Sequence, residues 1–370
     1  MKIRVERATL LDAVLKMQKI VGAKSSMPVL EGILMSAEKG LLTLSAYNLE
    51  MGMKKEMYAS CEEEGDIVIN ARLLADILRK LRGIDVEIEC DDRLVCHIRS
   101  GEAVFDIMGM EANDFPEMPS LTEGENLVLN GEDFCELVKG TIFAVSQIEG
   151  TRPILTGINI SVKNGVLQFV AIDGYRLAIR RKAVDINISN DIEFIVSGKA
   201  LNEVVKLIDE NSEEIEIKVG KRLILFKISG YVFIARLLEG EFVNYEKIIP
   251  SDHIQTTTVV CDEMIDSVER VSLLINDSFS TPIRCAFSKE ELLISCSTAL
   301  GRAKEKMSIN LEGNEFEMGL NSRYLLEALR ACECEKITFK FNGANAGVTI
   351  TPADDNAQDM LYLIMPMRLK

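Results

Sequence analysis

The sequence is poor in the residues and motifs from which catalytic sites are assembled. Its 370 residues include only two histidines, His97 and His253, and neither lies beside a plausible nucleophile. It contains no phosphate-binding loop, no dinucleotide-binding glycine motif, no zinc-protease motif and no nucleophile-elbow motif. Because acid–base and nucleophilic chemistry needs such groups to converge, we expect no catalytic residue, no metal site and no cofactor.

Long apolar segments are also missing. No run of about 18 apolar residues occurs, and charges interrupt the opening residues MKIRVERATLLDAV. A signal peptide needs an uninterrupted apolar centre, so these residues do not fit one. We therefore expect a cytoplasmic protein without membrane contact.

Nine cysteines are scattered along the chain, an odd number without paired spacing. The one close pair, Cys332 and Cys334, lacks the second pair or nearby histidine that a zinc site requires. Several of the others lie in apolar stretches, where a free cysteine behaves as a small hydrophobe. We expect buried free thiols rather than a metal or redox centre.

The most informative feature that is present is a threefold repeat with a spacing of about 125 residues. The stretches KGLLTLSAYN, NGVLQFVAID and EELLISCST align so that Leu42, Leu167 and Leu292 coincide. A second block recurs in the same order as NARLLADIL, SGKALNEVV and NSRYLLEAL, and a third as PVLEG, PILTG and, more weakly, PIRCAF. Solenoid repeats are shorter than this, so the repeated unit is a whole domain.

Length and linkers support three domains. Units of roughly 120 residues are long enough to bury their own cores. Polar, proline-bearing stretches at 119–125 and 249–255 separate them. The predicted domains are 1–122, 126–250 and 252–370.

Each domain is predicted to contain two helices and about eight short strands. Apolar residues at helical spacing indicate helices at 8–20 and 71–81 of the first repeat. Alternating segments such as 85–90 and 93–100 indicate strands. Because hairpin-like turns connect most strands, the sheets should be largely antiparallel, which is the α+β class.

The predicted helices differ in charge from the rest of the chain. The net charge is −16, yet acidic and basic residues balance within the helical stretches. A nearly neutral face in an acidic body tolerates a polyanion without holding it tightly, although ordinary solvated helix positions explain the same pattern. The basic residues of these stretches are Lys16, Lys19, Arg72, Arg79, Lys80, Arg82, Lys139, Lys199, Lys206, Arg270, Arg323 and Arg330.

Four segments make the whole chain resemble a known family. RPILTG at 152–157, AIDGYRLAI at 171–179, LLEGEFVNYEKIIP at 237–250 and LYLIMPMRLK at 361–370 resemble the bacterial DNA polymerase III beta subunit, the processivity sliding clamp, in order and spacing. The resemblance implies three repeated clamp domains per chain and a head-to-tail ring dimer. In that family the helices line a central hole and a continuous layer of sheet forms the outside.

The implied mechanism is topological. A closed ring stays on DNA without tight contacts, so sparse contacts to phosphate suffice and do not depend on DNA sequence. Implied partners are duplex DNA, the DNA polymerase III catalytic subunit, the clamp loader, and other polymerases and repair proteins that carry short linear motifs. Family positions and the helix charges together give the expected DNA-facing residues Lys24, Arg79, Lys80, Arg82, Arg152 and Lys199.

The resemblance also implies a peptide-binding groove between the second and third domains. The sequence Met-Pro-Met-Arg near the chain end offers adaptable thioethers beside a proline that stops strand pairing, although a last strand packed into its own domain explains it without a partner. The family often has threonine, histidine, proline and arginine at positions 172, 175, 243 and 247, so client preference is open. The groove positions are Leu155, Ile172, Gly174, Tyr175, Arg176, Leu177, Val243, Lys247, Ile248, Leu363, Ile364, Met365, Pro366, Met367 and Arg368.

The expected joint between two chains departs from the family pattern. The stretch TALGRAKEKM at 298–307 is more basic than the acidic family stretch, and GEAVFDIM at 101–108 carries fewer basic residues than usual. We expect the joint to depend on apolar contacts of Phe105, Ile107, Leu273 and Leu274.

Besides the clamp, two other classes of protein remain open, and so does a variant of the clamp itself. A repeat scaffold would bind peptides without encircling DNA, and an enzyme would need an unrecognised pocket with converging titratable groups. A divergent second clamp would serve a specialised client. Retention on nicked circular DNA separates a clamp from a scaffold.

Overall fold

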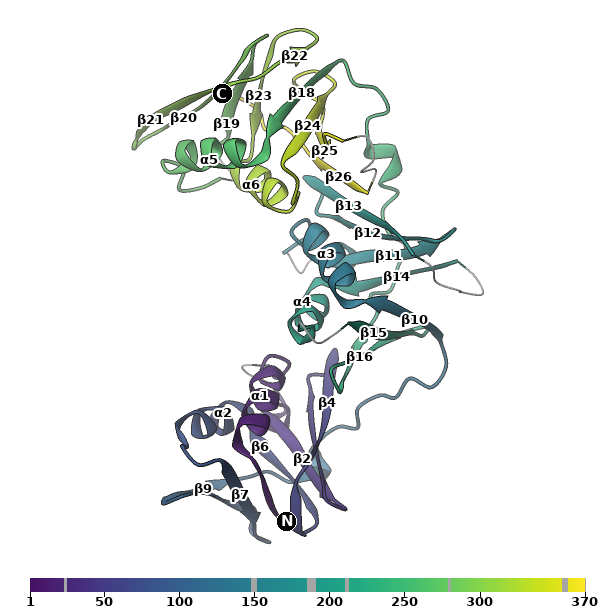
Figure 1. Cartoon of the computed structure of the whole chain (residues 1–370), viewed down its shortest axis with the longest axis vertical. Coiled ribbons are helices and arrows are strands. Elements are labelled where there is room, and N and C mark those ends of the chain that lie inside the picture. Colours follow the sequence, from purple (N-terminus) through teal and green to yellow (C-terminus); the bar gives the residue numbers. More distant parts are fainter. Residues whose placement is uncertain are drawn as a thin grey trace. The chain divides into compact units, whose positions relative to one another are not determined.

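The fold follows the threefold repeat of the sequence. A computed structural model describes residues 1–22, 25–147, 152–184, 191–209, 213–278, 281–354 and 359–369 (Figure 1). Within these residues, each third of the chain contains two helices and eight or nine strands, β1 to β9, β10 to β17 and β18 to β26. The predicted α+β class with largely antiparallel sheets is confirmed.

The described part of the chain contains six helices, two in each third. Asn70 and Asn321 cap two of them, because each side-chain oxygen accepts a hydrogen bond from a backbone N–H of the first turn. The helix predicted at 8–20 is shorter, since it ends at Met17. The helices are α1 (Arg7–Met17), α2 (Ala71–Lys80), α3 (Gly131–Ile142), α4 (Gly198–Leu207), α5 (Cys261–Ser272) and α6 (Ser322–Arg330).

The chain divides into two units that do not follow the predicted domain boundaries. One unit is Met1–Phe134 with Lys199–Leu237, and the other is Cys135–Gly198 with Leu238–Lys370. The middle third of the chain therefore contributes to both. The predicted boundaries stay a prediction, because strand pairing continues across them: β4 pairs with β17 in the first unit and β13 with β26 in the second.

The first unit contains two antiparallel sheets. The five-stranded sheet has the order β5 (Ser60–Glu63), β1 (Lys2–Glu6), β7 (Asp85–Cys90), β8 (Val95–Ser100) and β9 (Ala103–Met108). The eight-stranded sheet has the order β10 (Glu125–Asn130), β15 (Glu214–Val219), β16 (Leu223–Ile228), β17 (Tyr231–Arg236), β4 (Met51–Tyr58), β3 (Leu41–Tyr47), β2 (Gly32–Glu38) and β6 (Gly65–Asn70).

The second unit repeats this design with nine and four strands. The larger sheet has the order β14 (Ile192–Ser197), β11 (Gly157–Lys163), β12 (Val166–Ile172), β13 (Arg176–Ala183), β26 (Met360–Ile364), β25 (Val348–Pro352), β24 (Lys336–Phe341), β18 (Gln255–Val260) and β22 (Leu311–Glu312). The smaller sheet has the order β21 (Gly301–Ser308), β20 (Glu291–Thr298), β19 (Ile283–Phe287) and β23 (Phe316–Leu320).

The aligned positions of the repeat are core positions. Leu42, Leu167 and Leu292 lie on β3, β12 and β20 and are completely or almost completely buried. In a strand, residues two positions apart face the same side, and the residues two and four positions further along each of these strands are buried as well. The repeat therefore preserves the inward face of one strand in each third.

All nine cysteines are free thiols. Five are buried, Cys96, Cys261, Cys285, Cys296 and Cys332, and the other four are partly exposed. No three His, Cys, Asp or Glu side chains among the described residues are arranged to hold a metal ion. Over the same residues, every helix is too short or too polar to cross a membrane.

Candidate partner-binding site

The candidate site lies in the second unit around β13. This strand pairs with β12 on one side and with β26 on the other, which brings residues far apart in the sequence into one cluster. The buried members are Val170, Ile172, Leu177, Ile179 and Leu363. The partly buried members that pack against them are Leu155, Phe242, Tyr245, Ile249 and Leu361.

Exposed apolar side chains lie close to this cluster in the chain. Tyr175 is 65% exposed, although a tyrosine ring carries a large apolar surface. Met365 and Ile248 are each more than a third exposed. The backbone N–H of Met365 donates to the carbonyl oxygen of Tyr175 over 2.8 Å, so these two residues are neighbours at the ends of β26 and β13.

A tight turn places Tyr175 in this exposed position. Asp173 accepts hydrogen bonds from the backbone N–H groups of Tyr175 and Arg176 at 2.9 and 3.0 Å, the usual role of an aspartate at a turn. Gly174, which follows Asp173, has a φ of +93°. Residues other than glycine rarely adopt this backbone conformation. The sequence Asp-Gly-Tyr-Arg therefore specifies the turn locally.

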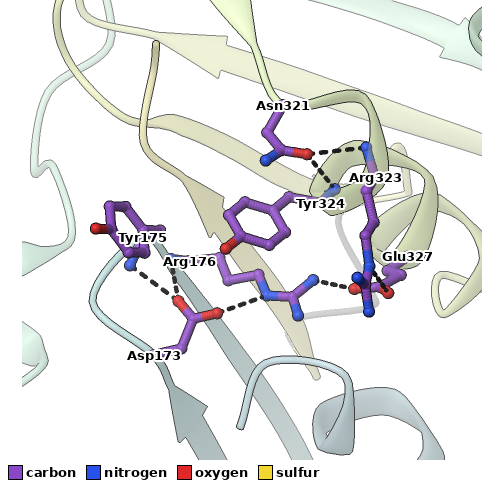
Figure 2. A network of polar contacts seen from close by, with 7 residues as sticks. All are labelled: Asp173, Tyr175, Arg176, Asn321, Arg323, Tyr324 and Glu327. Atoms are coloured by element: carbon purple, nitrogen blue, oxygen red, sulfur yellow. Dashed lines mark hydrogen bonds and ion pairs between the residues drawn. The ribbon is translucent and has the colours of Figure 1, made fainter. Parts of the chain in front are cut away.

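Arg176 is the centre of a buried polar network (Figure 2). Its Nε donates to Asp173 Oδ2 over 3.0 Å, and its Nη1 donates to Glu327 of α6. Its guanidinium carbon lies 4.2 Å from the ring centroid of Tyr324, within the range of a cation–π contact. Only 4% of the Arg176 side chain is exposed. Arg176 therefore links β13 to α6.

The other side of the network is built by the start of α6 (Figure 2). Asn321 accepts hydrogen bonds from the backbone N–H groups of Arg323 and Tyr324. Glu327 binds Arg323 over 2.9 Å as well as Arg176, and this hydrogen bond raises the pKa of the Arg323 guanidinium. Burial raises the pKa of Tyr324. The site thus lies beside a helix start at which Asn321 accepts from two first-turn N–H groups.

A tilted pair of tyrosine rings connects the network with the surface. The ring centroids of Tyr175 and Tyr324 lie 6.4 Å apart, with an interplanar angle of 31°. Tyr324 is fixed by α6 and by Arg176, whereas Tyr175 is mostly exposed. Since aromatic pairs stabilise one another by about 0.5–1.5 kcal/mol, the buried network orients the exposed ring.

The chain end is held against β23. After Ile364 the strand β26 stops, and Pro366 follows, which has no N–H to donate. The backbone N–H of Met367 then donates to the carbonyl oxygen of Gly319 over 2.8 Å. A Cβ atom on Gly319 would lie 2.6 Å from the oxygen of Met367, so glycine permits this close approach.

The predicted groove residues separate into a buried and an accessible group. The buried group is Ile172, Arg176, Leu177, Leu363 and Ile364. The accessible group, partly or largely exposed, is Leu155, Gly174, Tyr175, Val243, Lys247, Ile248, Met365, Pro366, Met367 and Arg368.

Sequence reasoning missed the acidic partners of Arg176. Asp173 had a usable signal, since an Asp-Gly pair between two apolar runs is typical of a turn. Glu327 had none toward Arg176, because their hydrogen bond joins residues 151 positions apart.

The predicted DNA-facing residues of the described chain lie on its surface. Arg79 forms an ion pair with Asp76 over 2.9 Å. The other exposed residues are Lys80, Arg82, Arg152 and Lys199. Lys24 lies outside the described residues.

The predicted joint residues lie at sheet edges and at a helix end. Phe105 and Ile107 are partly exposed on β9, the last strand of the five-stranded sheet. Leu273, directly after α5, is 80% exposed, and Leu274 is partly exposed.

Three family profiles match the chain one after another. They are the DNA polymerase III beta subunit N-terminal domain over residues 1–119, its central domain over 128–244 and its C-terminal domain over 246–368. Together they leave only short segments of the chain unmatched.

Whole-chain comparisons give the same family. The beta sliding clamp of Bacillus subtilis is 30% identical over 381 residues, with all of both chains covered. That of Halalkalibacterium halodurans is 29% identical, with 98% of both covered. The crystal structure of the Bacillus subtilis DNA polymerase sliding clamp has a TM-score of 0.95 at 29% identity, and a putative DNA polymerase III beta subunit from Eubacterium rectale has 0.93 at 26%; each covers both chains completely.

Proposed function

This chain belongs to the DNA polymerase III beta subunit family, and on that premise we propose that two copies close head to tail around duplex DNA. Its function is that of a sliding clamp, a processivity factor for DNA polymerase. This conclusion rests on the three family matches, which follow one another along almost the whole chain. Each matched segment contains one of the buried strands of the threefold sequence repeat.

Free sheet edges support the proposed ring. β9 and β21 are each the last strand of a sheet, and an exposed edge of this kind pairs readily with another strand. Exposed apolar side chains lie on or near these edges, among them Val104, Met108 and Leu273. We place the β9 edge of one copy beside the β21 edge of the next, with Phe105, Ile107, Leu273 and Leu274 in the joint.

Weak contacts to phosphate suffice for the proposed DNA-facing residues. Arg79, Lys80, Arg82, Arg152 and Lys199 are exposed, and Lys24 is assigned from the sequence alone. Exposed cations bind phosphate without regard to base sequence, and each contact is sensitive to salt. A ring needs no more than this, since its closure prevents dissociation.

The accessible group of site residues is the proposed surface for clients. Tyr175, Ile248 and Met365 expose apolar area and are close in sequence to members of the buried cluster, which suits the apolar side chains of a short linear peptide. The proposed clients are the DNA polymerase III catalytic subunit, the clamp loader, other polymerases and repair proteins. Flexible methionine allows one surface to accept several of them.

We assign the chain no catalytic reaction and no cofactor, and we place it in the cytoplasm. The relatives it matches are named sliding clamps, and a processivity factor acts by tethering. The buried polar network around Arg176 has its carboxylates paired with arginines, so it is suited to holding the site rather than to proton transfer.

Ring closure is tested by topology. Loaded onto nicked circular DNA by a cognate clamp loader, the protein should remain bound through gel filtration and be lost when the DNA is linearised. Retention on linear DNA, or no retention on circles, would contradict the ring and favour the scaffold.

The client surface is tested separately. Tyr175→Ala should lower the affinity for the polymerase catalytic subunit by about tenfold, the usual effect of removing one aromatic anchor. Tyr58→Ala is the matched control, because Tyr58 lies in the first unit and is 90% exposed. Equal affinities of the two variants would exclude Tyr175 from the client surface.

A further inference from the structure

Two thiols meet in the first unit, at the end of the β7–β8 hairpin. Cys90, the last residue of β7, lies directly opposite Cys96 of β8. Their sulfur atoms are 2.7 Å apart. Five residues separate the two cysteines in the sequence, a spacing that does not by itself indicate a pair. The contact is therefore a product of the strand register.

The pair occupies an inward position of the five-stranded sheet. Residues two positions apart on a strand face the same side, and the next opposed pair on this side, Ile88 and Ile98, is completely buried. Cys96 is completely buried as well, whereas Cys90 is partly exposed. A reagent dissolved in water therefore reaches the pair through Cys90.

The backbone geometry at this position suits a covalent bond between the two sulfurs. Cys90 forms both of its main-chain hydrogen bonds with Met1: its N–H donates to the Met1 carbonyl oxygen over 2.9 Å, and its carbonyl oxygen accepts from the Met1 nitrogen over 3.2 Å. Cys90 and Cys96 are thus a non-hydrogen-bonded pair, in which the Cα atoms lie about 4.5 Å apart. Disulfides span Cα separations of about 4.4–6.8 Å.

The pair does not lie at the edge that we assign to the joint between copies. The sheet order is β7, β8 and then β9, so both cysteines are on inner strands and β9 alone forms that edge. Cys90, the accessible member, lies two strands away from Phe105 and Ile107 of β9.

We propose that Cys90 and Cys96 form a reversible disulfide by exchange with a low-molecular-weight disulfide, and that this bond fastens the β7–β8 hairpin. In the first step the Cys90 thiolate attacks one sulfur of the small disulfide, whose S–S bond breaks and releases one small thiolate. In the second step the Cys96 thiolate attacks the Cys90 sulfur, and the second small thiolate leaves. Each departing thiolate takes up the proton that a cysteine has lost. Two cysteines are oxidised and one small disulfide is reduced to two thiols.

The hydrogen bond between the sulfurs prepares the pair for this exchange. Cys90 donates to Cys96, and this bond lowers the pKa of Cys96 and raises that of Cys90. The thiolate is the reactive form of cysteine. Transfer of the shared proton to Cys96 places the thiolate on Cys90, the member that a small disulfide can reach.

The bond is reversible by the same chemistry. Excess small thiol runs both steps backwards, and disulfides of cytoplasmic proteins are mostly transient and redox-sensing. The pair is thus suited to a change in the redox state of its surroundings rather than to permanent cross-linking.

A second pair of thiols provides an internal comparison. The hydrogen bond with Cys332 lowers the pKa of Cys261, so these two thiols are also neighbours. Their residues are only 1% and 4% exposed, respectively. If access selects the reactive pair, Cys261 and Cys332 should stay reduced in the folded protein.

The disulfide is tested by incubating the reduced full chain with oxidised glutathione, blocking the remaining thiols with N-ethylmaleimide in urea, and digesting with trypsin. Trypsin cleaves after Arg93, between the two cysteines, so the disulfide links peptides 83–93 and 94–99. Mass spectrometry should find these peptides linked and free of glutathione, and dithiothreitol should separate them.

Three variants test the order of the steps. Cys96→Ser should accumulate a glutathione adduct on Cys90, because no second thiol displaces it. Cys90→Ser should leave the buried Cys96 unmodified. Cys61→Ser is the matched control, because Cys61 is a partly exposed cysteine on β5 of the same sheet, and it should form the linked peptides as the wild type does.

Thermal unfolding tests the effect on the hairpin. Oxidation should raise the melting temperature of the first unit by roughly 5–10 °C, because the bond closes a short loop in the unfolded chain. The melting temperature of Cys90→Ser should be the same with and without oxidised glutathione.

Four outcomes would overturn the proposal or one of its parts. A lasting glutathione adduct on Cys90 of the wild type, without linked peptides, would show that the two thiols do not react with each other. Equally fast linkage of Cys261 with Cys332 would show that access does not select the pair. An adduct on Cys96 in Cys90→Ser would contradict the order of the steps. An unchanged melting temperature of the linked protein would remove the fastening of the hairpin.

Discussion

Replacing Arg176 with methionine should destabilise the second unit by about 3 kcal/mol. Breaking a buried ion pair costs about 3–5 kcal/mol, because the remaining charge keeps its desolvation penalty without its partner. The substitution leaves Asp173 with a side chain only 10% exposed. Glu327 is 26% exposed and keeps Arg323 as a partner, which places the expected loss at the lower end. The methionine sulfur retains part of the contact with the Tyr324 ring.

The assay is urea unfolding of the full chain, with the midpoint compared at an unchanged slope. For a unit of roughly 150–250 residues, 1 kcal/mol corresponds to about 2–4 °C in melting temperature. In thermal unfolding, Arg176→Met should therefore lower the melting temperature of the second unit by about 6–12 °C. The same variant should weaken polymerase binding, since Tyr324 and with it Tyr175 lose their support.

Arg323→Met is the matched control. Arg323 binds the same carboxylate, Glu327, but its side chain is 54% exposed, and pairs four residues apart on an exposed helix contribute about 0.3–0.5 kcal/mol. Both variants remove a guanidinium from Glu327, but only Arg176→Met removes a buried charge, and it also leaves the buried Asp173 without its partner. If they differed by less than about 1 kcal/mol, the reasoning from burial would be refuted.

Three further predictions concern other parts of the chain. Leu273→Ala should leave the unfolding midpoint nearly unchanged, because the side chain is 80% exposed, but should raise the dimer dissociation constant in sedimentation by about tenfold; an unchanged constant would exclude Leu273 from the joint. Gly319→Ala should displace the chain end and lower polymerase affinity, because its Cβ would lie 2.6 Å from the oxygen of Met367, and a wild-type affinity would show that the chain end does not contribute. The hydrogen bond from Lys163 lowers the pKa of Glu193, so its stabilising contribution is present above the ordinary pKa of 4.5 and is lost as the pH falls through the lowered value. Glu193→Gln should accordingly flatten the loss of stability on acidification, and a parallel profile would contradict this.

The inward face of the strands could be predicted from the sequence because burial constrains residue type at every second position. Leu42, Leu167 and Leu292 are core residues as the repeat indicates. The helix predicted at 8–20 was too long for a related reason. Ile20 is buried but follows the end of α1, where its N–H donates to Met17 three residues earlier. An apolar pattern reports burial, and burial does not require helical backbone.

The polar network of the site could not be predicted in the same way. Arg176 and Glu327 meet only because β13 pairs with β26, which brings α6 to the turn after β12. Nothing in either local sequence indicates the other. The resemblance to the family marked Arg176 as a site residue, which stays a prediction, and its burial suits it to supporting Tyr175 through Tyr324.

Two strand ladders cross the boundaries between the family matches. β4 and β17 form a ladder of five residue pairs, and so do β13 and β26. Main-chain hydrogen bonds of this kind break together, since strands in register cannot slide by less than a full repeat. The two ladders therefore join the paired strands into continuous sheets and are not suited to act as hinges. In the proposed ring we therefore expect opening at the contact between copies, where apolar side chains separate without breaking a sheet.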